Sequence, residues 1–97
     1  MKLRAIQNKI RTGHYTITDH ALIESFKDGV DLDDILHVTL TGRVVETYPG
    51  RQRLLIGGRT AKKKRVHVVI EDTGREPAIV TVYVPDSKLW MKGMVIK

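Results

Sequence analysis

Lys64-Arg65-Val66-His67-Val68-Val69-Ile70-Glu71 and Ala78-Ile79-Val80-Thr81-Val82-Tyr83-Val84-Pro85 are the two runs that decide the fold of this 97-residue chain. Both are rich in β-branched residues, which favour pleated strands. Residues 72–77 between them read Asp-Thr-Gly-Arg-Glu-Pro, a sequence typical of turns. The two runs therefore predict a β-hairpin.

Alternation along the hairpin separates apolar from polar side chains, because successive residues of a strand point to opposite faces. One face is predicted to form a dry floor of aliphatic residues: Val66, Val68, Ile70, Val80, Val82 and Val84. The other face then carries Arg65, His67, Val69, Thr81 and Tyr83. We expect any chemistry of this protein on that second, polar side.

The N-terminal half has helical rather than alternating periodicity. Apolar residues predict three short helices, with the stripes Leu3, Ile6 and Ile10; Leu22, Ile23 and Phe26; and Leu32, Ile35, Leu36 and Leu40. Thr18 and Asp31 have the residue types that cap helix N-termini, and Gly13, Gly29 and Gly42 those that end helices.

Two further strands are predicted between these helices and the hairpin. They cover Arg43–Tyr48 and Arg51–Arg59, joined by a turn at Pro49-Gly50, with the second strand weakened or bulged at Gly57-Gly58. Near the end of the chain, Ser87 is a candidate cap for a short helix that contains Leu89, Trp90 and Met91. We therefore expect one α+β domain over residues 1–97. Two to three N-terminal helices would pack on one face of a four-stranded antiparallel sheet, followed by a short C-terminal helix.

Composition narrows the classes of function. No apolar run is long enough to span a bilayer, and no cysteine is present, so we expect a cytoplasmic protein without disulfides. Residues 1–50 have 6 Lys/Arg and 7 Asp/Glu, net −1, whereas residues 51–97 have 11 and 4, net +7. Positive charge in the strand-rich half indicates an anionic partner, either nucleic acid or an acidic protein, or else a solvated basic surface.

The residues do not match metal or cofactor motifs, since the four histidines are scattered and no Gly-rich phosphate loop is present. We expect no cofactor and no metal. One metal-free reaction suits a small basic protein, namely cleavage of RNA by its own 2′-hydroxyl. Histidine can transfer the protons, arginine can hold the phosphate, and tyrosine can stack on a base or donate a hydrogen bond.

The candidate catalytic residues are His20, His67, Tyr83 and Arg53. Candidate RNA-binding residues follow the basic strands and the turn between them: Arg51, Arg59, Lys62, Lys63, Lys64, Arg65 and Thr81. Arg51 and Arg53 are expected to alternate on one strand and share a face. Each candidate also has a structural alternative: His67 as an ordinary strand residue, and the lysine run as a soluble hairpin tip.

Several short segments together resemble a family of small prokaryotic domains of unknown function that is grouped with RelE-like toxins of type II toxin–antitoxin pairs. They are Asp19-His20-Ala21, Tyr48-Pro49, His67-Val68-Val69-Ile70 and Thr81-Val82-Tyr83-Val84-Pro85-Asp86 followed by Trp90. The resemblance runs from about Thr16 to Trp90. By position, His20, His67, Thr81 and Tyr83 match the residues that recur in that family.

This resemblance implies a RelE-like fold and an RNA-cleaving toxin, acting on mRNA, either free or on the ribosome, and held inactive by a cognate antitoxin protein. Two features depart from the pattern. Glu24 and Asp28 stand where relatives often have arginines, and no tyrosine follows Tyr83. The alternative is a non-catalytic RNA-binding or protein-interaction module on the same fold.

Overall fold

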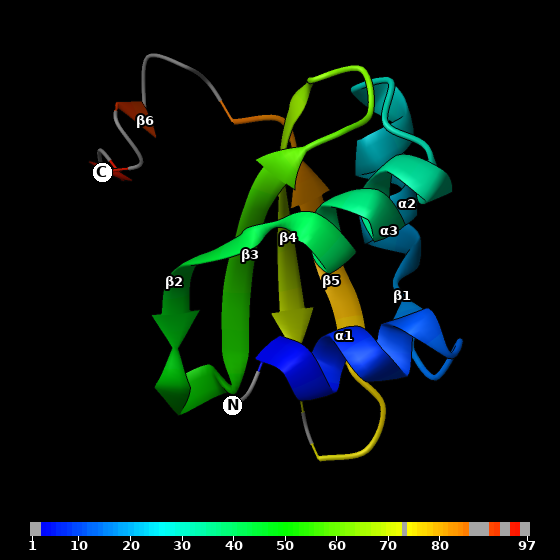
Figure 1. Ribbon diagram of the computed structural model, residues 1–97, viewed down its shortest axis with the longest axis vertical. Helices are drawn as coiled ribbons and strands as arrows, with labels where there is room; N and C mark the ends of the chain where they lie inside the picture. The colour runs from blue at the N-terminus through cyan, green and yellow to red at the C-terminus, as the bar shows by residue number, and fades with distance from the viewer. Residues whose placement is uncertain (1–2, 73, 86–89, 92–93, 96–97) are drawn as a thin grey trace.

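Three helices and a five-stranded mixed sheet form the body of the computed structural model, which describes residues 3–72, 74–85, 90–91 and 94–95 (Figure 1). The helices are α1 (Leu3–Arg11), α2 (Asp19–Lys27) and α3 (Leu32–Thr41). The sheet contains β1 (Thr16–Ile17), β2 (Arg43–Tyr48), β3 (Arg53–Arg59), β4 (Arg65–Glu71) and β5 (Ala78–Tyr83). A short 3-10 helix, η1 (Pro49–Arg51), joins β2 to β3.

The helix boundaries lie where the predicted caps place them. The Thr18 hydroxyl accepts a hydrogen bond from the Ala21 amide at 3.1 Å and caps α2. Asp31 and Asp34 form a reciprocal capping box at the start of α3, with bonds of 2.8 and 3.1 Å. Gly29 ends the α2 segment at φ +72°, a left-handed conformation that glycine adopts without steric cost.

The order of strands in the sheet is β1-β5-β4-β3-β2. The four long strands are antiparallel, as expected, and the hairpin of β4 and β5 is confirmed. The predicted four-stranded antiparallel sheet is nevertheless incomplete, because β1 adds a fifth strand parallel to β5, with Thr16 beside Ala78. With two residues, β1 is too short to show alternation in the sequence. Backbone bonds from Thr16 to Pro77 and from Thr18 to Ile79, each 3.0 Å, hold it in place.

One face of the sheet forms the hydrophobic core with the helices. Figure 1 shows α1 and α3 in front of the sheet and α2 beside β5. The helices supply Ile6, Ile10, Ala21, Ile35 and Val38, and the strands supply Leu54, Ile56, Val66, Val68, Ile70, Ile79 and Val82. The predicted dry floor is therefore correct for β4, for Val82 and for Val84, which is half-buried and packs against this cluster.

The predicted core assignments are wrong in part on three elements. On β5, the pairing shifts between Ile70↔Ile79 and Val69↔Thr81, so Val80 is the extra residue of a β-bulge and Ile79 takes the core position. On α2, the buried residues are Ala21 and Ser25, whereas Ile23 and Phe26 of the predicted stripe are exposed. On α3, Leu32 of the predicted stripe is exposed, whereas Val38 and Thr39 are buried with Ile35.

The predicted C-terminal helix is also wrong where the structure describes it. Trp90–Met91 (β6) and Met94–Val95 (β7) are strands that pair antiparallel with each other. Two apolar pairs separated by Lys92-Gly93 have the spacing of a tight hairpin, which the helical interpretation overlooked. Ser87 and Leu89 lie outside the described residues. In the part of the chain that is described, no helix is long and apolar enough to cross a membrane.

Candidate functional site

The second face of the sheet carries a group of mostly polar side chains in three cross-strand rows. Residues paired in register on neighbouring strands point to the same face. The rows are Tyr48, Arg53, Glu71 and Ala78; Glu46, Leu55, Val69 and Thr81; and Arg43, Gly57, His67 and Tyr83. We call these twelve residues the polar face. Leu55 and His67 are buried on it, yet neither belongs to the core cluster under the helices.

Two of the predicted catalytic side chains, His67 and Tyr83, are in direct contact on the polar face. The predicted arrangement, with both on one side and Thr81 beside them, agrees with the strand register. His67 Nδ1 lies 3.2 Å from the Tyr83 hydroxyl, and the two rings meet edge to face at 5.3 Å. His67 is 4% exposed, and its burial, with a smaller effect of Arg65, lowers its pKa to about 4. The imidazole is therefore neutral at pH 7.

Gly57 gives His67 the space that its ring occupies. A Cβ at Gly57 would lie 3.2 Å from Cδ2 and Nε2 of the imidazole and 2.7 Å from Cγ2 of Val45. The predicted bulge at Gly57-Gly58 is wrong, because β3 and β4 pair without interruption from Arg53 to Arg59. The irregularity lies instead on β2, between Val44 and Glu46. The glycines of β3 mark close approach of neighbouring groups rather than a bulge.

A second polar pair, which the sequence-based prediction missed, lies on β2. The Tyr48 hydroxyl donates a 2.9 Å hydrogen bond to Glu46. Burial and then the Glu46 carboxylate raise the pKa of Tyr48 to about 12, and burial followed by Glu46 also raises the pKa of Tyr83. Both phenols thus stay protonated and able to donate. The sequence did indicate that Glu46 and Tyr48 share a face, because they are two residues apart on a predicted strand.

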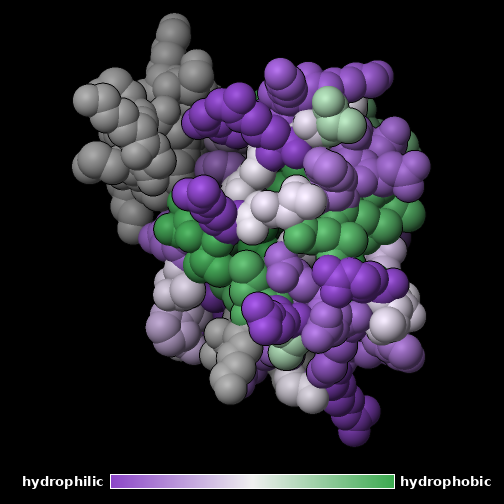
Figure 2. Space-filling model, viewed as in Figure 1, coloured by the Kyte–Doolittle hydropathy of each residue, from purple (hydrophilic) through white to green (hydrophobic). Residues whose placement is uncertain are grey.

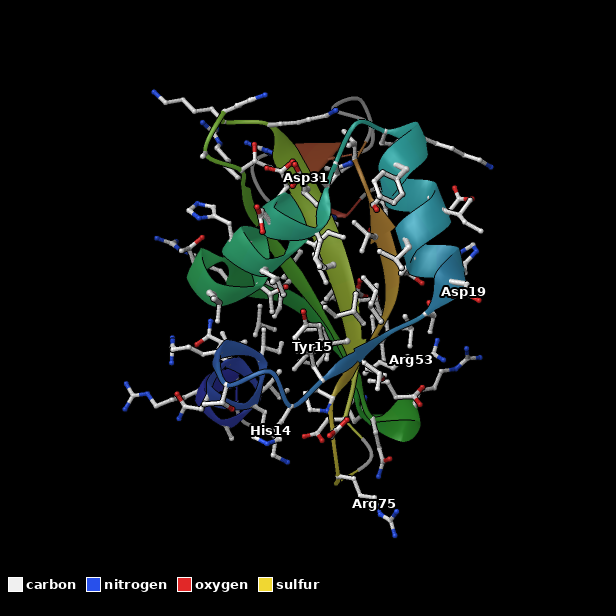
Figure 3. The ribbon with its side chains drawn as sticks, turned by 90° about the vertical axis from the view of Figure 1, so that its right-hand side faces the viewer. His14, Tyr15, Asp19, Asp31, Arg53 and Arg75 are labelled. Atoms are coloured by element: carbon white, nitrogen blue, oxygen red, sulfur yellow. The ribbon has the colours of Figure 1, made fainter. Side chains whose placement is uncertain are left out.

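Arg53 lies in the row of Tyr48, and its Nε donates a 2.8 Å hydrogen bond to the Glu71 carboxylate. Figure 3 shows Arg53 on the side of the sheet away from α1. Arg51 does not alternate with it as predicted, because Arg51 belongs to η1 and Gln52 follows in a left-handed conformation at φ 53°. The connection between β2 and β3 is therefore two residues longer than the predicted turn at Pro49-Gly50, because it also includes Arg51 and Gln52.

His20 is not brought together with His67. It is exposed in the first turn of α2, two residues after Thr18, whose amide donates to the Ile79 carbonyl. Ile79 pairs with Ile70 and Tyr83 pairs with His67, so His67 lies one strand further across and three residues further along β4 than the level of Thr18. At about 3.3 Å per residue, the two levels are roughly 10 Å apart. A mechanism that uses both imidazoles on one phosphodiester is therefore not supported by this arrangement.

The predicted basic residues gather beyond the His67 row, at one end of the sheet. Arg59 and Arg65 are cross-strand partners and both are exposed. Lys62 and Lys63 are exposed in the turn that follows, and the Lys64 ammonium donates to the Asp28 carbonyl of the α2 C-terminus. Within residues 3–72 and 74–85, no group of three or more His, Asp or Glu is arranged to hold a metal ion.

Comparison with known families places most of this chain in one group. A family model described as a domain of unknown function, DUF4258, matches residues 17–84, from β1 to the end of β5. The match includes the whole polar face, α2 and α3. No curated protein and no solved structure matches the chain. The chain therefore belongs to the DUF4258 family of domains of unknown function.

Proposed function

We propose that this protein binds single-stranded RNA across the polar face. The observation that carries the proposal is that Tyr48 and Tyr83, both half-buried, share one side of the sheet with Arg53. Tyrosine rings provide stacking surfaces for unpaired bases, and a guanidinium can hold a phosphate. Arg53 keeps other donors besides the Nε that bonds Glu71.

Charge supports the same ligand. The basic end formed by Arg59, Lys62, Lys63 and Arg65 lies next to the His67 row, so an extended anionic chain over the tyrosines would pass this cluster. The net charge of +7 in residues 51–97 favours its approach. Arg51 and Lys64 would add to the field, and Thr81 would offer a hydroxyl beside the Tyr83 row.

The second candidate is metal-independent RNA cleavage by a RelE-like toxin, controlled by an antitoxin protein in the cytoplasm. The His67–Tyr83 hydrogen bond is the observation that favours it. A neutral imidazole can accept the 2′-hydroxyl proton, but the low pKa makes His67 a weak base and leaves it without a proton to donate at pH 7, and His20 is too far away to replace it. Tyr83 would then have to protonate the leaving oxygen. Burial of His67 favours the binding function over this one.

The test measures binding and cleavage of one fluorescent single-stranded RNA in parallel. We expect Tyr83→Ala to weaken binding by about tenfold or more, because a stacking surface is removed, and Tyr83→Phe to weaken it less. His14→Ala, an exposed change outside the polar face, is the matched control. If Tyr83→Ala and wild type bind the RNA with equal affinity, RNA does not bind on this face.

Cleavage is read from the same samples with and without chelator. Products that form in chelator with wild type, and disappear with His67→Ala, would establish the toxin chemistry. If the protein binds the RNA and no cleavage products form, only the binding function is supported. No affinity for RNA even at low salt would refute both candidates.

A further inference from the structure

Helix α2 turns its large apolar residues outward. Ile23 is 54% exposed and Phe26 is 65% exposed, whereas Ala21 and Ser25 are buried against the core. Ile23 and Phe26 are three residues apart, so they are neighbours on one side of the helix. Figure 2 shows hydrophobic surface in the region of α2 and α3, with hydrophilic surface around it. An exposed apolar stripe on so short a helix is a mark of an interaction site.

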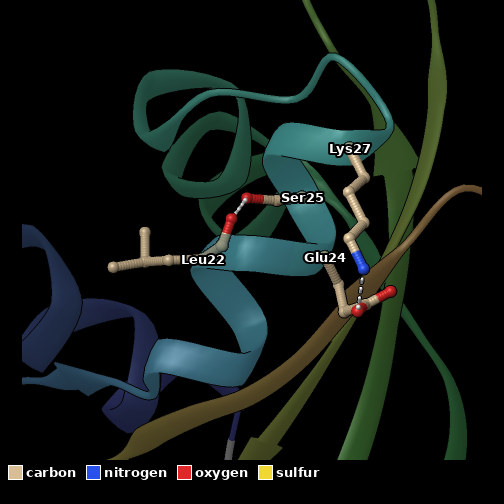
Figure 4. A network of polar contacts seen from close by, with 4 residues as sticks. All are labelled: Leu22, Glu24, Ser25 and Lys27. Carbon is tan, nitrogen blue, oxygen red and sulfur yellow. Dashed lines mark hydrogen bonds and ion pairs between the residues drawn. The ribbon is translucent and has the colours of Figure 1, made fainter.

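The inward contacts of α2 leave this stripe unused. The Ser25 hydroxyl donates to the Leu22 carbonyl at 2.8 Å, within the helix, and the Thr18 hydroxyl donates to the Val80 carbonyl at 3.3 Å. Figure 4 shows the Leu22 side chain on the opposite side of α2 from the ion pair of Glu24 and Lys27, whose atoms are 3.4 Å apart. α2 therefore packs on the rest of the protein through its small residues Ala21 and Ser25. Its apolar stripe of Ile23 and Phe26 faces solvent beside the ion pair.

Carboxylates outnumber cations in the segment that carries the stripe, and Lys27 beside it is paired with Glu24. Residues 19–34 contain a single lysine, Lys27, and six carboxylates: Asp19, Glu24, Asp28, Asp31, Asp33 and Asp34. The segment has a net charge of −5 in a chain of net +6. Four of these acids, Asp19, Asp31, Asp33 and Asp34, lie at the N-cap or in the first turn of α2 or α3, which explains their positions, but their charges still add to one acidic field.

We propose that Ile23 and Phe26, with the bordering carboxylates Asp19, Glu24 and Asp28, form a docking surface for a basic amphipathic helix of a partner protein. The apolar side of that helix covers Ile23 and Phe26, and its lysines or arginines face the carboxylates. Charge favours this partner, since residues 19–34 have a net charge of −5. Lys64 of the basic end reaches this segment at the α2 C-terminus, on the Asp28 carbonyl. The surface is independent of the RNA proposal, because none of its residues lies on the polar face.

The test uses two synthetic helical peptides with the same leucine stripe, one with lysine and one with glutamate at every polar position. We expect the lysine peptide to bind the full chain, measured by fluorescence anisotropy, and the glutamate peptide not to bind. The double variant Ile23→Ser, Phe26→Ser should bind the lysine peptide at least about tenfold more weakly, because it removes two buried apolar side chains from the interface. Val44→Ser is the matched control, since Val44 is 41% exposed on β2, away from α2.

Three results would overturn the proposal. They are equal affinity of the double variant and wild type for the lysine peptide, equal binding of both peptides to wild type, and no binding of either. Analytical ultracentrifugation tests whether a second copy of this chain binds to the docking surface. A dimer of wild type that dissociates in the double variant would assign the surface to a second copy of this chain instead. Circular dichroism of each variant shows whether it remains folded.

Discussion

At the scale of single residues, the polar face depends on Gly57, which lies under the imidazole of His67. Gly57→Ala would place a methyl group 2.7 Å from Val45 and 3.2 Å from the ring, so strands or side chains must move. We expect a loss of roughly 1–3 kcal/mol in the free energy of unfolding, measured by urea denaturation. Gly50→Ala is the control, because no atom lies within 4 Å of its Cβ position. Equal stability of the two variants would contradict the close approach.

His67 also makes stability depend on pH. Its folded pKa of about 4 lies below the ordinary value of 6.5, so the unfolded chain binds more protons between these two values. Stability from neutral His67 is complete above pH 6.5 and falls as the pH drops toward 4, by up to about 3 kcal/mol. Urea midpoints at pH 7 and pH 4.5 measure this loss. We expect a smaller difference in His67→Phe; an unchanged difference would mean that other groups cause it.

At the scale of elements, α2 begins at the Thr18 cap, which also connects the helix to β5. Thr18→Ala removes the bond to the Ala21 amide and the bond to the Val80 carbonyl. The expected cost is about 1 kcal/mol, up to about 2, by thermal or urea denaturation. Thr41→Ala is the comparison, since Thr41 is exposed and bonds only within its own helix, to the His37 carbonyl. A Thr18 variant as stable as the Thr41 variant would show that the cap is dispensable.

The elements also show what the sequence could predict. Capping residues are local signals, so Thr18 and Asp31 placed their helices correctly. Strict alternation put His67, Thr81 and Tyr83 on one face, because each strand is regular over the relevant span. These local rules were sufficient to predict the hairpin and the composition of its polar side.

The remaining errors come from tertiary contacts that periodicity does not record. The bulge at Val80 moves Ile79 into the core, and nothing in a run of β-branched residues indicates where such a shift falls. The apolar period of α2 is real, but it faces solvent, and only the packed structure distinguishes this from a core stripe. Glu46 and Tyr48 joined the site because β2 pairs with β3 rather than through any motif.

At the scale of the whole molecule, charge is unevenly distributed, with an acidic helical segment and a basic end of the sheet that meet where Lys64 bonds to the Asp28 carbonyl. Replacing Lys62, Lys63 and Arg65 by alanine should weaken RNA binding and reduce the slope of log K against log salt by up to about 0.7 for each phosphate that the variant no longer binds. A triple variant of Arg4, Arg11 and Arg75 removes the same charge elsewhere. If RNA affinity falls equally in both triple variants, net charge rather than the basic end attracts the RNA.

The pairing of β1 with β5 has a consequence for how this chain is made. Thr16 and Ala78 are partners although 62 positions separate them, so β1 cannot pair until β5, the last of the five strands in sequence, has been synthesised. During translation, α1, α2 and α3 can form their turns, but the ladder that fixes β1 cannot close until β5 has left the ribosome. Contacts of this long range slow folding. A nascent chain that stops before Ala78 should therefore remain sensitive to protease, and gain protection once Tyr83 has emerged.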